Sequence, residues 1–306
     1  MALRLAVPKK YSGLLRLGTT SWKYDSWKGL VYDPKKTYRP DDYLADYARY
    51  LGSVEVDQWF YSLFPGGLRL PDPGVARLYA KSVPKDFVFT VKAPNSLTLT
   101  HYYSRQMPRY AEFAGKPNPA FLDSALLDRF LESLAPLGDK LGPVMFQFEY
   151  LNKKKMPSVE AFMERFGAFI DRAPKGRQYA VEVRNKSFYS PAYFDFLKKR
   201  GLGFVYVEVL YMPPAGEVFD AFEPETAPFQ VIRLHGGDRA EIEGRTKKVW
   251  DKIVVPRAEG LAAAAKIVRS NAKKGIVTYL NMSNHYEGSA PLSLRRFLDI
   301  LAGKKT

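Results

Sequence analysis

The chain has 306 residues, a formal net charge of +15 and no cysteine. The lack of cysteine excludes disulfides, thiolate nucleophiles and cysteine-ligated zinc, so any metal would need carboxylate, histidine, amide or water ligands. No apolar run reaches the length of about 18 residues that a membrane span needs, and the apolar part of the first segment is too short for a secretory signal. We therefore expect a cytoplasmic protein with no membrane partner.

The positive charge favours polyanionic partners, because each lysine or arginine that neutralises a phosphate releases counterions. The basic residues fall in short runs at 153–155, 198–200, 245–248 and 273–274, which do not obviously belong to one surface. Solubility is the alternative explanation for such a charge. The expected partner is therefore an anionic small molecule or a nucleic acid, and the sequence predicts no oligomeric state.

Short β-branched and aromatic runs alternate with amphipathic helical patterns along the chain. The expected strands are 14–21, 53–58, 87–93, 142–148, 178–183, 203–209, 229–235 and 275–281. The expected helices are 41–51, 74–81, 120–135, 159–171, 192–200, 258–271 and 292–301. The connection 211–228 is rich in proline and glycine, so we expect it to be mostly loop.

Eight strands that alternate with helices over more than about 250 residues are typical of a (β/α)8 TIM barrel with long βα loops. A doubly wound open sheet is the competing fold. No G-x-G-x-x-G motif follows the first strand, which weakens the dinucleotide-binding form of that fold and indicates no nucleotide cofactor. With no repeat or linker, we expect a single domain over 1–306 with flexible ends at about 1–12 and 302–306.

Polar residues end nearly every expected strand, which is where a barrel of this kind places its chemistry. Side chains two residues apart share a strand face, so Glu182 with Arg184 and Arg233 with His235 should point into the barrel. An unpaired charge in such a place costs several kcal/mol, so these groups should be paired or serve a function. The alternative to a functional site is a set of interior ion pairs, with Glu182–Arg184 as the first candidate.

The residues at the strand ends fall into three groups of candidates. Glu182, His235, Glu55 and Lys92 are the catalytic candidates, because carboxylates, imidazoles and amines carry out acid–base chemistry. A divalent metal is the cofactor that such groups could hold, with Glu55, Glu182, Glu208 and His235 as candidate ligands. The substrate-binding candidates are Thr20, Ser21, Trp22, Tyr61, His101, Gln147, Arg184, Arg233, Asn281 and Asn284.

The tryptophans lie in the same segments as these candidates. Trp22, Trp27, Trp59 and Trp250 follow the first, second and seventh strands, so they would surround the same mouth of the barrel. Aromatic faces beside cations suit stacking on a base or a sugar. Packing of long loops onto the barrel rim is the alternative, and it is the favoured explanation for Trp27 and Trp250.

Several motifs in these segments carry a family resemblance. They are GTTSW at 18–22, VEVDQWFY at 54–61, FTVKAP at 89–94, LGDKLGPVMFQF at 137–148, AVEVRNKSF at 180–188, RLHG at 233–236 and NMSNHYEGSAP at 281–291. Through them the chain resembles the domain of unknown function 72 family, also called YecE-like proteins, over almost its whole length. The resemblance implies a TIM barrel and brings no established reaction. The chain departs from the family pattern at Asp57 and Glu149, which add two carboxyl groups at the mouth of the barrel.

Two hypotheses of different classes follow. In the first, the protein is a hydrolase or lyase that acts on a phosphorylated or nucleic-acid substrate, with Lys92, Arg184 and Arg233 holding anionic oxygens. In the second, a basic surface binds nucleic acid and the barrel interior is only structural. We favour the enzyme, because so many convergent ionisable groups are costly as scaffolding.

The enzyme hypothesis makes a geometric and an energetic prediction. The residues that should converge on one pocket at the C-terminal end of the barrel are Glu55, Lys92, Gln147, Glu182, Arg184, Arg233, His235 and Asn281. In a solvated pocket, replacing Glu182 by glutamine should cost about 1 kcal/mol or less. An interior ion-pair partner should instead cost about 3–5 kcal/mol.

Overall fold

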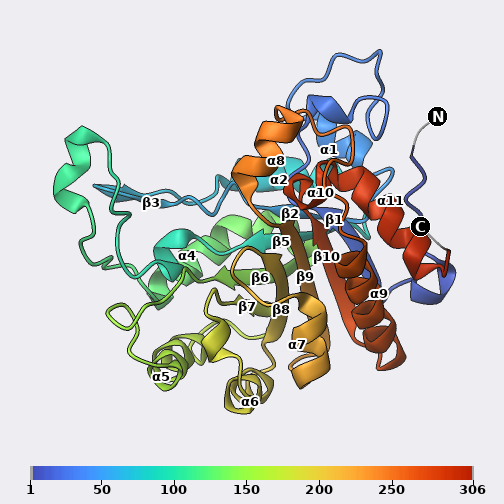
Figure 1. Ribbon diagram of the computed structural model, residues 1–306. Helices are drawn as coiled ribbons and strands as arrows, with labels where there is room; N and C mark the ends of the chain where they lie inside the picture. The colour runs from blue at the N-terminus through green and yellow to red at the C-terminus, as the bar shows by residue number, and fades with distance from the viewer. Residues whose placement is uncertain (1–2, 305–306) are drawn as a thin grey trace.

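The computed structural model describes residues 3–304 and shows a parallel barrel surrounded by helices (Figure 1). Every expected strand is confirmed, with ends that differ from the prediction by at most two residues. The barrel strands are β1 (Leu15–Thr19), β2 (Ser53–Val56), β5 (Val88–Lys92), β6 (Leu141–Gln147), β7 (Tyr179–Glu182), β8 (Gly203–Val209), β9 (Phe229–Gly236) and β10 (Val277–Met282). The (β/α)8 fold expected from the sequence is therefore confirmed.

The strands run in the order β1-β10-β9-β8-β7-β6-β5-β2, and all neighbours are parallel. The barrel is closed between β1 and β2 by one bridge, Thr20 to Glu55. The Ser21 N–H donates to the Glu55 carbonyl at 3.1 Å in the same place. Glu55 thus closes the barrel with its backbone while its side chain points inside.

A helical side chain completes this seam below the bridge. Tyr47 of α1 (Asp42–Tyr47) accepts a hydrogen bond from the Thr19 N–H at 3.0 Å and donates one to the Ser53 carbonyl at 2.8 Å. The two backbones are so close that a Cβ on Gly18 would lie 2.5 Å from the Ser53 carbonyl oxygen. Only glycine fits at this position of β1.

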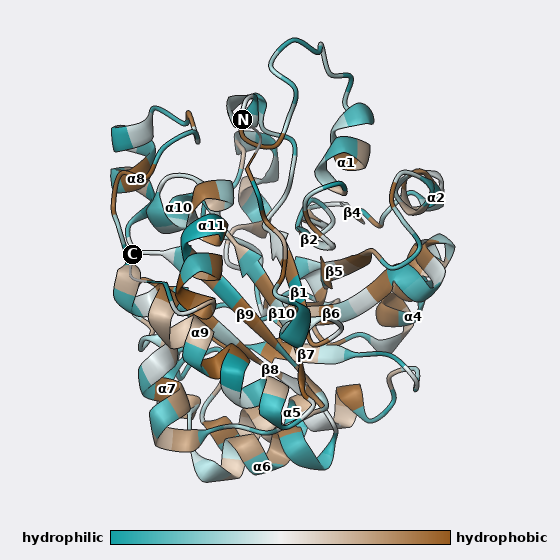
Figure 2. Cartoon of the chain, turned by 90° about the vertical axis from the view of Figure 1, so that its right-hand side faces the viewer, coloured by the Kyte–Doolittle hydropathy of each residue, from teal (hydrophilic) through white to brown (hydrophobic). Residues whose placement is uncertain are grey.

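The expected helices are confirmed as α1, α2 (Pro73–Lys81), α4 (Ser124–Leu134), α5 (Val159–Ile170), α6 (Pro191–Lys199), α9 (Ala258–Lys273) and α11 (Ala290–Leu301). The first turns of α2, α4, α5 and α6 are capped by Asp72, Asp123, Ser158 and Ser190, whose side chains accept backbone N–H groups. Teal and brown residues lie side by side on these helices in Figure 2, as in helices with one buried face. Within residues 3–304 no helix is both long and apolar enough to cross a membrane.

The prediction of a mostly loop connection over 211–228 is wrong, because α7 (Ala215–Phe222) lies there. Pro214 precedes the first turn, where a fixed φ favours a helix start, and Val218 and Phe219 bury the inner face. The further short elements are η1 (Lys9–Tyr11), η2 (Asp25–Trp27), β3 (Leu63–Phe64), β4 (Gly67–Leu68), α3 (Asn95–Thr98), η3 (Pro108–Phe113), η4 (Ala135–Lys140), η5 (Lys186–Phe188), α8 (Arg239–Thr246) and α10 (Asn284–Glu287). The hairpin β3–β4 and the η3 segment both project from the barrel at the left of Figure 1.

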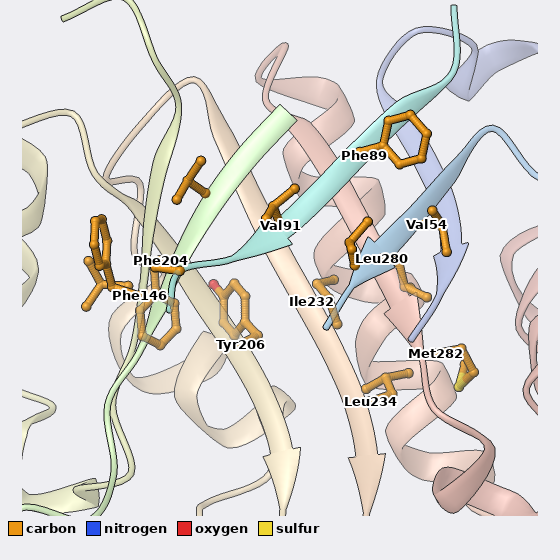
Figure 3. Close-up of a cluster of buried hydrophobic side chains, with 14 of the residues drawn as sticks. Val54, Phe89, Val91, Phe146, Phe204, Tyr206, Ile232, Leu234, Leu280 and Met282 are labelled. Atoms are coloured by element: carbon orange, nitrogen blue, oxygen red, sulfur yellow. The ribbon is translucent and has the colours of Figure 1, made fainter. Parts of the chain in front are cut away.

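Strand alternation divides the apolar residues between two cores. Outward residues such as Val54, Val91, Phe146, Ile232 and Leu280 pack under the helices (Figure 3). Inward residues fill the lower half of the barrel, towards the amino ends of the strands, as a separate cluster: Met145, Ala180, Val205, Phe229, Val231 and Tyr279. The upper half is filled by polar side chains.

The chain ends were expected to be flexible. In the described part of the first end, Leu5 and Tyr11 are buried against the barrel, and the Leu3 N–H donates to the Leu30 carbonyl at 3.1 Å. Residues 1–2 and 305–306 lie outside the described residues. Residues 3–12 therefore pack onto the barrel.

Candidate active site

An ion-paired network fills the upper half of the barrel, with Arg233 of β9 at its centre. Its Nε and Nη2 donate to the two Glu55 carboxylate oxygens at 2.8 and 2.6 Å. Its Nη1 donates to Gln147 Oε1 at 2.9 Å and also to the Glu182 carboxylate. Arg184 Nη2 lies 2.5 Å from the other oxygen of Glu182. The expected pair Glu182–Arg184 is present, but Arg233, which joins three strands, is the main partner.

Pairing keeps these buried groups ionised. Burial opposes ionisation of Glu182, but the charges of Arg184 and Arg233 outweigh it and hold the pKa of this carboxyl below its ordinary value. Arg233 is 1% exposed, and although burial opposes its charge, Glu182 and Glu55 raise its pKa above the ordinary value. A carboxylate held this way is a poor proton donor. Glu182 is thus an interior ion-pair partner, and for such a partner the expected cost of replacement by glutamine is about 3–5 kcal/mol.

Lys92, the last residue of β5, lies beside the network without joining it. Its side chain is 7% exposed, and its Nζ lies 3.7 Å from the centroid of the Phe60 ring. Within residues 3–304 this Nζ has no hydrogen bond and no carboxylate within 4 Å. Burial and then the charge of Arg233 lower the pKa of Lys92 to about 8, and nearby carboxylates offset this only in part. About a tenth of this amine is therefore uncharged at pH 7, against well under a hundredth for a lysine with the ordinary pKa.

Two further groups at this level favour their neutral forms. Burial, followed by the charge of Glu55, raises the pKa of Asp57, the residue that follows β2. Burial, followed by Arg233 and Arg184, lowers the pKa of His235 well below its ordinary value. His235 Nε2 is buried and has no hydrogen-bond partner among the described residues. The site thus holds a neutral imidazole and a carboxyl that protonates easily.

His235 stays on the same side of the strand layer as Glu182, as the enzyme hypothesis requires. His235 lies two residues beyond Arg233 on β9, so both face the interior. Asn281 of β10 also points inward, but its amide donates to Thr90 Oγ1 at 3.1 Å, and the side chain is fully buried. Glu55, Gln147, Glu182, Arg184 and Arg233 are thus joined in one packed network, whereas Asn281 bonds to Thr90 beside it.

Glu208 does not join these residues, because it lies on the outer face of β8. Its carboxylate accepts a hydrogen bond from the Tyr286 hydroxyl at 2.8 Å. Across the described chain, no three or more histidine, aspartate or glutamate side chains are placed to hold a metal ion. The candidate ligand set Glu55, Glu182, Glu208 and His235 is therefore not assembled in this structure.

Several substrate-binding candidates have structural partners instead. The indole of Trp22 is 2% exposed and meets Tyr79 edge to face, with ring centroids 5.1 Å apart. Trp59 is buried and stacks on the same Tyr79, and Trp27 donates to Asn284 Oδ1 at 3.1 Å. Trp250 is buried as well. The tryptophans thus pack the loops onto the barrel, as favoured for Trp27 and Trp250, and they do not offer stacking faces at the mouth.

Four tyrosines and Phe64 are the aromatic residues that remain exposed in the described loop segments at the carboxyl ends of the barrel strands. Tyr61, Tyr103, Tyr150 and Tyr211 follow β2, β5, β6 and β8, and all four are exposed. Tyr61 was a candidate from the sequence, and the other three were missed. Their position just after strands was the available signal, whereas tryptophans have more apolar surface to bury.

Unpaired cations lie on the same loops. Arg105, Lys116, Lys153, Lys154 and Lys186 follow β5, β6 and β7, are exposed, and have no carboxylate within 4 Å among residues 3–304. We call these five residues the rim cations.

The other basic runs lie elsewhere or are neutralised. The runs at 198–200 and 273–274 end α6 and α9 at the opposite end of the barrel, where Arg200 pairs with Asp171 and Lys274 with Glu223 and Glu225. The run at 245–248 contains two ion pairs, Arg245 with Glu241 and Lys248 with Glu243. Unpaired cations therefore lie at both ends of the barrel. The rim cations lie on the loops after β5, β6 and β7, and Lys198, Lys199 and Lys273 lie at the opposite end.

A hollow lies beside the network and outside the strand layer. It has a volume of about 860 Å³ between the loop after β8 and the first turn of α9. Glu208, Tyr211, Arg257 and Tyr286 line it. Glu208 Oε2 would lie 2.5 Å from a Cβ on Gly260, so this glycine leaves the carboxylate room. The ionic network itself is packed, and any ligand there would contact its upper surface.

The fold and the buried charges define a (β/α)8 barrel with an ionic layer at its C-terminal mouth. The family model described as "Protein of unknown function DUF72" matches residues 16–306, and the chain belongs to this family, which is the YecE-like family. Among solved structures, a DUF72 family protein from Enterococcus faecalis V583 is 22% identical, with a TM-score of 0.61 and coverage of 95% of this chain and 97% of that chain. A DUF72 family protein from Thermotoga maritima MSB8 is 21% identical, with a TM-score of 0.63 and coverage of 94% and 99%. No curated protein matches the chain.

Proposed function

We propose that this protein is an enzyme that acts on a phosphorylated substrate held at the C-terminal mouth of the barrel. The observation that carries the proposal is the set of five rim cations, which no carboxylate of residues 3–304 neutralises. Exposed unpaired cations around a barrel mouth attract anions and raise their local concentration. The loops after β5, β6 and β7 would hold the phosphate while the barrel centre faces the rest of the substrate.

The ionic network has a supporting role in this proposal. Arg233 uses four of its five N–H groups on Glu55, Gln147 and Glu182 and is 1% exposed, so a substrate cannot reach it. Arg184 is different, because its side chain is 21% exposed and makes one ion pair. Arg184 and Lys92 are therefore the cations at the barrel centre that a substrate can contact.

The acid–base groups would be those whose pKa is shifted towards the neutral form. The pKa of Glu182 is lowered, whereas His235 is neutral and Asp57 protonates more easily than an ordinary carboxyl. A neutral imidazole accepts a proton, and a protonated carboxyl donates one. We assign proton transfer to His235 and Asp57, and a positioning role to Glu55 and Glu182.

A matched pair of triple variants tests the proposal. Lys153, Lys154 and Lys186 become alanine in the first, and Lys198, Lys199 and Lys273 in the second. All six are exposed and free of ion pairs among residues 3–304, so both variants lose the same charge from opposite ends of the barrel. Binding of pyrophosphate and of a fluorescein-labelled oligonucleotide is measured at about 50 and 200 mM salt.

We expect the mouth variant to bind pyrophosphate about tenfold more weakly at the lower salt and the control to stay within about twofold of the parent. Equal losses in both variants, or no binding by the parent, would contradict a phosphate site at the mouth. Tight binding of the oligonucleotide that depends on the mouth lysines, without binding of pyrophosphate, would favour a nucleic acid as the substrate.

A further inference from the structure

We propose that Lys92 is a nucleophile that forms an imine with a carbonyl group of the substrate, which makes the protein a lyase for phosphorylated aldehydes or ketones. This inference rests on the proposed function, which supplies the phosphate group of the substrate. It adds a carbonyl group as the part of the substrate that reacts. It also gives a role to the one lysine of residues 3–304 whose side chain is buried.

Most of the surroundings of Lys92 oppose its charged form. The Nζ has neither a hydrogen bond nor an ion pair among the described residues. Its place over the Phe60 ring favours the ammonium form and offsets this only in part. The nearby carboxylates of Glu55 and Glu182 are already engaged by arginines. A lysine that is desolvated and next to another cation is activated for attack on a carbonyl carbon. Burial and Arg233 together lower the pKa of Lys92 to about 8, in agreement with this geometry.

Lys92 is also at the right level of the barrel. It ends β5 in register with Met145, two residues before Gln147 on β6, and the charges of Arg233, Glu55 and Glu182 act on it. The strand β5 leads into the loop that carries Arg105 and Lys116. The substrate would place its carbonyl carbon at Nζ and its phosphate towards the rim cations. The side chain retains 7% of its exposure, so Nζ is at the upper surface of the packed network.

The chemical steps balance with groups of this chain and water. The Nζ lone pair forms a bond to the carbonyl carbon, and the nitrogen passes one of its protons to the carbonyl oxygen to give a carbinolamine. The nitrogen lone pair then forms the C=N bond as water leaves, and Asp57 passes a proton from solvent water to the leaving hydroxyl. The iminium accepts the electron pair of a neighbouring C–C bond when neutral His235 removes the proton of a β-hydroxyl, which releases an aldehyde. Protonation of the enamine and hydrolysis by water return the free lysine.

Reductive trapping tests this step directly. The parent protein is incubated with dihydroxyacetone phosphate or glyceraldehyde 3-phosphate and cyanoborohydride at pH 7.5, and modified lysines are located by peptide mass spectrometry. At this pH a lysine of pKa about 8 has about a hundredfold more free amine than one with the ordinary 10.5. We expect Lys92 to be labelled first, with a rate that rises up to about pH 8 and then levels off.

Two variants serve as controls. Lys92→Met keeps the length and apolar stem of the side chain and should lose the adduct. Lys140→Met changes another partly buried lysine, at the opposite end of the barrel, whose Nζ donates to the Val83 carbonyl at 2.8 Å. This second variant should keep the adduct on Lys92.

The outcomes separate this inference from the proposed function. If pyrophosphate binds at the mouth but Lys92 is labelled no faster than exposed lysines, the imine proposal is wrong and the phosphate site stands. If Lys92 is trapped equally well by glyceraldehyde without a phosphate, the imine stands and the phosphorylated substrate is wrong. If neither pyrophosphate binding nor labelling of Lys92 is found, both proposals fail.

Discussion

The lower and upper halves of the barrel interior come from the same strands but are filled by different chemistry. The lower half is apolar, with Phe229 and Val231 of β9 among its members. Two residues further along β9, Arg233 begins an upper half of buried ions. Apolar packing stabilises a barrel without directional demands, whereas buried ions must recover a desolvation cost of several kcal/mol each. The two halves therefore differ in how they are stabilised. The lower half depends on apolar packing, and the upper half depends on paired charges, next to which Lys92 lies.

The largest loss of stability is expected when Arg233, the central cation of the upper half, is replaced. Arg233→Met leaves Glu55 and Glu182 buried with Arg184 as their remaining arginine, and it should lower the free energy of unfolding by about 3–5 kcal/mol at pH 7. The Glu182 pKa is lowered in the folded parent, so its stabilisation is present above the unfolded pKa of about 4.3 and is lost as the pH falls through the folded value.

In the variant, the buried carboxyls should protonate more easily, so its deficit should shrink as the pH falls towards about 4. Urea unfolding at several pH values measures this dependence. A deficit that is independent of pH would show that Arg233 stabilises the barrel by packing and not by charge.

The second-largest expected change in the free energy of unfolding is a gain and not a loss. Lys92→Met should stabilise the protein at pH 7 by up to about 3 kcal/mol, because a folded pKa of about 8, below the ordinary 10.5, means that the protonated amine is destabilising. The parent should become more stable as the pH rises from 8 to 10.5, where the folded protein has lost the proton and the unfolded chain has not. The gain of the variant should therefore fade over that range, and thermal melts would measure it. A loss of stability at pH 7 would mean that Lys92 is a structural residue.

An apolar truncation in the lower half provides the matching test of the first region. Val231→Ala removes two methyl groups from the packed cluster and should cost about 2 kcal/mol, including the cavity left behind. No titratable group is involved, so this cost should be the same at pH 4 and pH 7 in urea unfolding. A cost that varies with pH would show that the lower packing positions the ions above it.

The smallest loss of stability is expected when Arg184, the partly exposed member of the network, is replaced. Arg184→Met removes one ion pair of Glu182, while Arg233 remains in contact with the same carboxylate. Because water reaches the Arg184 side chain, the loss should be about 1 kcal/mol in the same unfolding measurement. A loss as large as that of Arg233→Met would mean that the two arginines stabilise Glu182 equally. If Arg184 contacts the substrate, pyrophosphate binding should also weaken in this variant.

The sequence determined the strands of this protein and the direction of most of their side chains. Period-two alternation is local, so Glu182 with Arg184 and Arg233 with His235 could be assigned to the interior without a structure. The face of Glu208 could not be assigned, because β8 is apolar on both faces until its end and carries no alternating signal. The helix α7 was missed for a similar reason, since proline and glycine mark helix starts as well as loops.

The tertiary structure alone decided which charges meet. Arg233 and Glu55 are 178 residues apart in the chain, and Trp27 and Asn284 are 257 apart, so no local pattern relates them. Their contacts depend on the stagger of neighbouring strands, which fixes the residues that share a layer of the barrel. This stagger brought Arg233 to Glu55 and Glu182 and left Lys92 without a partner among the described residues, whereas Arg184 and Glu182 pair as neighbours on one strand. The lowered pKa of Lys92 is thus a property of the folded network, because it is set by burial and by a charge from another strand.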